Sequence, residues 1–76
     1  MQDKLRPLST VTSGETVKLV KIDAGRNLNS RLASMGLLPN AEITVVRNDR
    51  RGPSVISIKD SKIMLGRGVT RKIMVL

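Results

Sequence analysis

Turn-forming residues interrupt this chain about every 8 to 12 residues, so no element has room to be long. The interruptions are Ser13-Gly14, Asp23 to Gly25, Pro39-Asn40, Asn48 to Pro53 and Asp60-Ser61. Between them lie short runs rich in valine, isoleucine and threonine, residue types that favour β-strands. Several short strands at this spacing are typical of a small all-β sandwich or barrel.

Five segments have the character of strands. They are residues 16–22, 42–47, 54–59, 62–65 and 73–75, with a tight hairpin turn at Asp60-Ser61. In the first of them the alternation of faces slips between Leu19 and Val20, which predicts a bulge or burial on both faces. Residues 8–11 are suited to one turn of helix, and residues 66–71 to a turn or a second such helical turn.

One segment has helical spacing. Leu28, Leu32 and Met35 recur at i, i+4 and i+7, which places them on one face of a short helix. Asn27 is the expected N-cap, and Gly36 stands where a helix ends in a left-handed residue. Eight or nine residues of helix are not stable alone in water, so we expect this face to pack into the core.

The helix is followed by two adjacent leucines and a turn. Pro39 and Asn40 suit the second and third positions of a type II turn, because asparagine tolerates a positive φ. Leu37 and Leu38 lie just past the helix end, where neighbouring side chains rarely both point inward. We therefore expect one of them, with Met35 or Leu32 nearby, to form an apolar surface patch.

Closing the sheet of so small a domain into a barrel removes its exposed edges. The sequence thus predicts a mainly β fold, a small SH3-like barrel of about five strands with one short α-helix. The barrel is expected over residues 8–76, after a flexible N-terminal tail at residues 1–7.

Side chains that carry chemistry are sparse. The chain has no cysteine and no histidine, which excludes thiol nucleophiles, the usual general base and common ligands of transition metals. The six carboxylates are scattered, and none of the glycines precedes a lysine as a phosphate-binding loop requires. We therefore expect a protein that is not an enzyme, with no cofactor and no dedicated metal site.

The charge balance indicates an anionic partner. Fourteen lysines and arginines against six acids give a net charge of +8. The candidates are nucleic acid, anionic lipid and an acidic protein surface, and the basic residues gather in two stretches: Arg47, Arg50 and Arg51, and Arg67, Arg71 and Lys72. Aromatic side chains, on which single-strand binders stack bases, are absent, which argues against nucleic acid. The sequence shows neither a membrane-spanning run nor a signal peptide, so we expect a cytoplasmic location.

Residues 32–43, Leu-Ala-Ser-Met-Gly-Leu-Leu-Pro-Asn-Ala-Glu-Ile, closely resemble a motif of the ferrous-iron transport protein A (FeoA) family, L-x-x-M-G-L-x-P-G-x-x-hydrophobic. The opening Leu8-Ser9-x-Val11-x-x-Gly14-Glu15, the Gly52-Pro53 pair and Leu65 to Gly68 also resemble the family. Asn40 replaces the usual glycine, a change that the turn tolerates.

The resemblance implies an SH3-like adaptor or regulator of the ferrous-iron transporter FeoB, which carries a GTP-binding domain on its cytoplasmic side. The residues we expect at the contact are Arg31, Leu32, Met35, Leu37, Leu38, Arg50 and Arg51. A monomer or weak self-association is expected, and the basic surface suits a further contact with anionic lipid. The alternative that the charge leaves open is a small nucleic-acid-binding barrel of the ribosomal or RNA-chaperone type.

Overall fold

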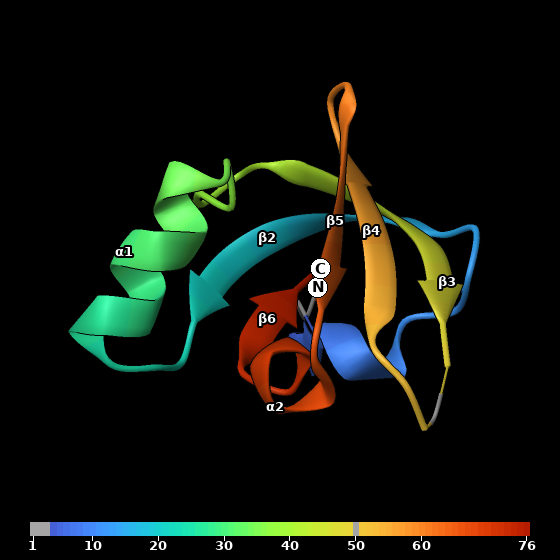
Figure 1. Cartoon of the computed structure of the whole chain (residues 1–76), viewed down its shortest axis with the longest axis horizontal. Helices are drawn as coiled ribbons and strands as arrows, with labels where there is room; N and C mark the ends of the chain where they lie inside the picture. The colour runs from blue at the N-terminus through green and yellow to red at the C-terminus, as the bar shows by residue number, and fades with distance from the viewer. Residues whose placement is uncertain (1–3, 50) are drawn as a thin grey trace.

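The computed structural model describes residues 4–49 and 51–76. Six strands form one antiparallel sheet in the order β1-β6-β2-β3-β4-β5, accompanied by three short helical segments (Figure 1). In chain order the elements are β1 (Arg6–Pro7), the 3-10 turn η1 (Leu8–Thr10), β2 (Thr16–Ile22), α1 (Arg26–Ser34), β3 (Glu42–Asn48), β4 (Ser54–Ile58), β5 (Ser61–Leu65), α2 (Arg67–Thr70) and β6 (Ile73–Val75).

The sheet curves into an open barrel, with β1 and β5 at its two edges, because β2 pairs with strands of both of its halves. The first part of β2 pairs with β3, with Val17 opposite Ile43, and the second part pairs with β6, with Leu19 opposite Val75. The register shifts between Leu19 and Lys21, which confirms the predicted bulge and bends the strand where it passes from one partner to the other. The mainly β, SH3-like barrel expected from the sequence is thereby confirmed.

The core is aliphatic throughout, since the chain has no aromatic residue. Alternate residues point inward where a strand is regular, as in β4, where Ser54, Ile56 and Ile58 are buried. The buried apolar side chains are Leu8, Val11, Val17, Leu19, Leu32, Leu37, Ile43, Val45, Ile56, Ile58, Leu65, Ile73 and Val75. η1 and α2 cover one end of this core, and α1 lies beside the end of β2 (Figure 1).

In the N-terminal half of the chain, the start of the sheet and the start of the helix differ from the prediction. Arg6 and Pro7, expected in the tail, form β1 opposite Val75 and Met74, so the sheet has six strands rather than about five. The helix is capped by Gly25 and not by Asn27, because the first helical hydrogen bond runs from the Asn29 N–H to the Gly25 carbonyl.

The hairpin turn also lies one residue earlier than predicted. Ile58 pairs with Ser61, so the two turn residues are Lys59 and Asp60, and Ser61 already belongs to β5. Lys59 adopts a φ of 53°. A positive φ at the first turn position is compatible with the right-handed twist of the two strands that the turn joins.

Neither helix of the described residues is long and apolar enough to cross a membrane.

Glu15 ties the N-terminal strand to the loop before β2. One carboxylate oxygen accepts a 2.8 Å hydrogen bond from Arg6, and the other accepts a 2.9 Å bond from the Thr12 N–H. The Arg6 bond and then the Thr12 bond hold the pKa of Glu15 below its ordinary value of 4.5. The ionised carboxylate is therefore the form that the folded protein favours.

A lowered pKa makes this contribution depend on pH. The stabilisation is complete above the ordinary pKa of about 4.5 and is lost as the pH falls through the lower value of the folded state. We expect Glu15→Gln to lower the urea midpoint at pH 7, and the difference from the parent chain to shrink as the pH approaches 3. Glu42→Gln removes the same charge without this hydrogen bond and serves as the control. A difference that stays constant with pH would contradict the assignment.

Candidate docking site

The end of α1 decides which of the two leucines is buried. Gly36 has a φ of +97°, and the helix closes with hydrogen bonds from the Gly36 N–H to the Ala33 carbonyl and from the Leu37 N–H to the Leu32 carbonyl, both of 3.0 Å. These two bonds form a Schellman motif, in which the residue after the glycine folds back on the last turn of the helix. Leu37 accordingly shares the core with Leu32.

The next four residues form the predicted turn. The Ala41 N–H donates to the Leu38 carbonyl at 3.0 Å, and Asn40 has a φ of 75°. The turn is fastened to β2 by two further bonds, from the Asn40 N–H to the Leu19 carbonyl at 2.7 Å and from the Leu19 N–H to the Ala41 carbonyl at 2.9 Å. Leu38 is thus held from both sides by ordered backbone.

Three exposed side chains, Met35, Leu38 and Pro39, make up what we call the docking ridge. Leu38 is 51% exposed and Met35 is 43% exposed, and Pro39 is exposed beside them. Apolar side chains fixed at the surface in a group are suited to contact with a partner, whereas a single exposed leucine is ordinary.

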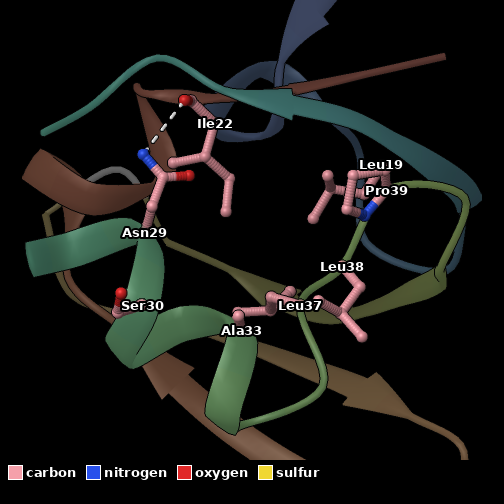
Figure 2. A pocket seen from close by; sticks show the side chains of 8 residues that line it. All are labelled: Leu19, Ile22, Asn29, Ser30, Ala33, Leu37, Leu38 and Pro39. Atoms are coloured by element: carbon pink, nitrogen blue, oxygen red, sulfur yellow. Dashed lines mark hydrogen bonds between the residues drawn. The ribbon is translucent and has the colours of Figure 1, made fainter. Parts of the chain in front are cut away.

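A hollow of about 250 Å³ lies on one side of the ridge, between α1, β2 and the loop after α1. Figure 2 shows Ala33 of α1 beside Leu37, and the side chain of Asn29 directed at Ile22 of β2. The polar end of the hollow is closed by Asn29, whose side-chain amide donates to the Ala24 carbonyl at 2.7 Å and the Gly25 carbonyl at 3.1 Å.

A larger groove of about 750 Å³ lies on the other side of the ridge. Its first wall is the segment from Met35 to Glu42, and its second wall is the β4–β5 hairpin, with Ile58 and Lys59. Leu38 and Pro39 line both depressions, so the ridge stands between two concave surfaces. A partner chain could lie along the groove while it contacts Leu38.

The sequence placed seven residues at this contact, and the structure shows some of them buried in the core and others exposed. Leu32 and Leu37 are 2% and 1% exposed, which corrects their assignment to the surface: the helix end folds both side chains into the core. Arg31 is exposed in the last turn of α1 and lies four residues before Met35, on the same side of the helix. Met35, which the sequence placed both on the core-facing side of the helix and at the contact, is half exposed.

Arg51 lies away from the docking ridge. β3 begins at Glu42, next to the turn that carries Leu38, and ends at Asn48, so its seven residues separate the two regions by about 20 Å at about 3.3 Å per residue. Arg51 is exposed at that far end. Arg50 lies outside the described residues.

The chain carries a net charge of +8, and the charged residues that line the groove beside the ridge are Lys59 and Glu42. Ion pairs within residues 4–49 and 51–76 involve Arg6 with Glu15 at 2.8 Å and Arg47 with Asp49 at 3.2 Å, while most of the other cations are exposed. In the same part of the chain no three carboxylates come together as a group that could hold a metal ion. The arrangement is suited to binding an acidic or apolar macromolecular surface.

Pro39 and the hairpin wall were not foreseen as part of the site. Pro39 could have been found, because the second position of a β-turn points away from its hydrogen-bonded ends. The hairpin wall could not have been found, because Ile58 and Gly36 come together only through tertiary packing. They are so close that a Cβ added at Gly36 would lie 3.8 Å from the Ile58 side chain.

The FeoA domain family model matches residues 6–76, which is nearly the whole chain. The chain belongs to the FeoA family. A protein of Methanocaldococcus jannaschii named as an Fe(2+) transport protein A is 46% identical over 69 residues, which cover 91% of this chain and 83% of that protein.

Solved structures agree with the family assignment. An iron uptake regulatory protein, FeoA, is 33% identical, with a TM-score of 0.85 over 95% of this chain and 94% of the other. A manganese-dependent transcriptional repressor is 22% identical, with a TM-score of 0.88 over the whole of this chain and 43% of its own. At that identity the second match concerns the fold alone. In this FeoA chain, the stretch from Leu32 to Ile43 that resembles the family motif builds the helix end, the ridge and the turn.

Proposed function

We propose that this FeoA-family chain is a non-enzymatic adaptor of ferrous iron uptake, acting on the cytoplasmic side of the membrane by binding the transporter FeoB through the docking ridge. The observation that carries the proposal is the position of Leu38. It is half exposed, fixed by hydrogen bonds on both sides, and placed between two concave surfaces. A rigid apolar anchor of this kind binds a partner with little loss of conformational entropy.

The family and its relatives support the transport part of the proposal. The names of the M. jannaschii protein and of the solved FeoA structure concern Fe(2+) transport and iron uptake. The chemistry of the chain supports a role in contact rather than in catalysis, because it contains neither histidine nor cysteine. Arg31, exposed beside the ridge, adds a cation that an acidic residue of the partner can approach.

Leu38→Glu is the variant that tests the docking ridge. We expect it to weaken binding to the cytosolic GTPase domain of FeoB about 30-fold or more, since a central anchor of an interface contributes about 2 kcal/mol or more. The measurement is an NMR titration of the ¹⁵N-labelled chain with that domain in about 150 mM salt, which screens charges beyond about 8 Å. Shifts in the parent chain should centre on residues 35–42.

Leu5→Glu provides the matched control, because it makes the same replacement at a leucine that is 41% exposed elsewhere on the surface. It should bind as the parent chain does. Equal affinity of Leu38→Glu and the parent chain would refute the docking ridge, and the absence of any shift in the parent chain would refute contact with this domain of FeoB.

The net charge of +8 favours one second candidate, a sequence-independent RNA-binding module. The two functions differ in their dependence on salt. A module that neutralises about four phosphates loses affinity with a slope near −4 in log K against log salt. Docking through an apolar ridge depends on salt far less, so a salt series with RNA and with the FeoB domain separates them.

A further inference from the structure

The strand at the end of the sheet, β5, has a free side. β5 is the last strand in the order β1-β6-β2-β3-β4-β5, and among the described residues its recorded strand pairing is with β4. Figure 1 shows the β4–β5 hairpin projecting beyond the rest of the barrel. An exposed edge of this kind is a template for pairing with another strand.

The hairpin register identifies which backbone groups point outward. Opposite residues in an antiparallel pair alternate between exchanging hydrogen bonds and not doing so. The two-residue turn makes Ile58 and Ser61 an exchanging pair, and the alternation makes Ile56 and Ile63 the next one. The intervening residues on β5, Lys62 and Met64, therefore direct their N–H and C=O groups away from β4.

The side chains of the same two residues lie on the outer face of the sheet. Met64 stands opposite half-buried Val55, and Lys62 stands opposite Ser57, while Ser61, Ile63 and Leu65 share the inner face. Met64 is 66% exposed, more than any other large apolar side chain that the structure describes. Met64 therefore places an apolar side chain at the surface beside the unpaired edge.

We propose that β5 accepts an additional strand from an acidic protein partner, along its free edge rather than on the docking ridge. A strand added beyond β5 places one residue beside Lys62 and another, two positions along, beside Met64. Charge and exposure together specify an acidic residue at the first position and an apolar residue at the second. The partner is an extended segment of the pattern acidic-x-apolar.

Charge also argues against a second copy of this chain as the added strand. Each copy carries a net charge of +8, and β5–β5 pairing would bring together edges that each carry an exposed lysine. Like charges on neighbouring strands are destabilising, and a lysine on an edge strand is a common protection against self-pairing. An acidic segment would instead place a negative charge beside Lys62, and opposite charges on neighbouring strands are stabilising.

The test uses the peptide acetyl-Thr-Glu-Thr-Val-Thr-Glu-Thr-amide, whose alternation reads the same in both directions. Amide hydrogen exchange of the ¹⁵N-labelled chain is followed by NMR with and without the peptide. When nine-tenths of the chain is bound, exchange at the Lys62 and Met64 amides should slow about tenfold, because only the free tenth remains open. The Ile63 amide, already directed at β4, should not change.

Charge reversal makes the test specific. Lys62→Glu should lose the response to this peptide and gain it with the same peptide carrying lysine for glutamate. Lys18→Glu makes an identical change at an exposed position of β2 and should behave as the parent chain does. Two results would overturn the proposal. One is unchanged amide exchange at Lys62 and Met64 when the peptide-induced shift changes have reached saturation, and the other is shift changes confined to residues 35–42. Exchange at Lys62 and Met64 that is already slow without peptide would also overturn it, since the edge would then be occupied by this chain or a second copy.

Discussion

Leu37→Ala is expected to lower the free energy of unfolding by about 2–5 kcal/mol, whereas Leu38→Ala should change it by about 0.5 kcal/mol or less. The two leucines are adjacent, but Leu37 is 1% exposed and packs with Leu32 in the core, while Leu38 is 51% exposed. A domain of this length has only about 4–11 kcal/mol of stability in total, so the first variant is close to unfolding.

Urea denaturation followed by circular dichroism measures both variants. If Leu37→Ala does not fold at all, Leu37→Met keeps the volume of the side chain and should cost less than about 1.5 kcal/mol. Equal losses for Leu37→Ala and Leu38→Ala would mean that the helix end does not direct Leu37 inward. Leu37→Glu, for the same reason, is expected to unfold the chain rather than to report on binding.

Asn48→Ala is expected to cost about 2–4 kcal/mol, because one side chain holds three segments together. Its amide donates to the Ser9 carbonyl at 3.1 Å and to the Val11 carbonyl at 2.6 Å, and its carbonyl oxygen accepts from the Ser54 hydroxyl at 2.8 Å. Ser54 is 3% exposed, so its hydroxyl has no ready access to water when this partner is lost. Each buried polar group left unsatisfied costs about 1–3 kcal/mol.

A double-mutant cycle with Ser54→Ala checks this assignment. The single change Ser54→Ala should cost about 1 kcal/mol, and the double variant should cost less than the sum of the two, because both singles break the same bond. Strict additivity in the urea measurements would show that the bond between Asn48 and Ser54 contributes nothing to stability.

The bulge in β3 explains how Asn48 reaches its partners. The register shifts between Val45 and Arg47, so that Val46 and Arg47 are both exposed and Asn48 returns to the inner side opposite Ser54. Alternation read from the sequence would have placed Asn48 on the outer face with Val46. A bulge arises from the pairing of two strands, and the sequence of β3 carries no local signal for it.

Interactions between residues close in the sequence were sufficient to predict most of the strands and helices and most of the turns. The strand and helix segments after β1 were predicted in the correct order, because β-branched runs, the helical spacing of Leu28 and Leu32, and Gly36 each act over a few residues. The same local rules, applied further, indicate that Leu37 is the buried leucine, since the residue after a left-handed glycine contacts the preceding turn of the helix. Pro39 and Asn40 fixed the turn that follows.

The composition of the site was decided by contacts between residues far apart in the sequence. Arg51 was grouped with Leu38 on charge, yet β3 carries the two to opposite ends of the barrel. The groove beside the ridge exists only because the β4–β5 hairpin packs over Gly36, and the free side of β5 exists only because the sheet order ends there. The sequence by itself determined which elements form, since propensity and turn chemistry are local. Tertiary structure decided which side chains face a partner, because strand order and register depend on the packing of the whole chain.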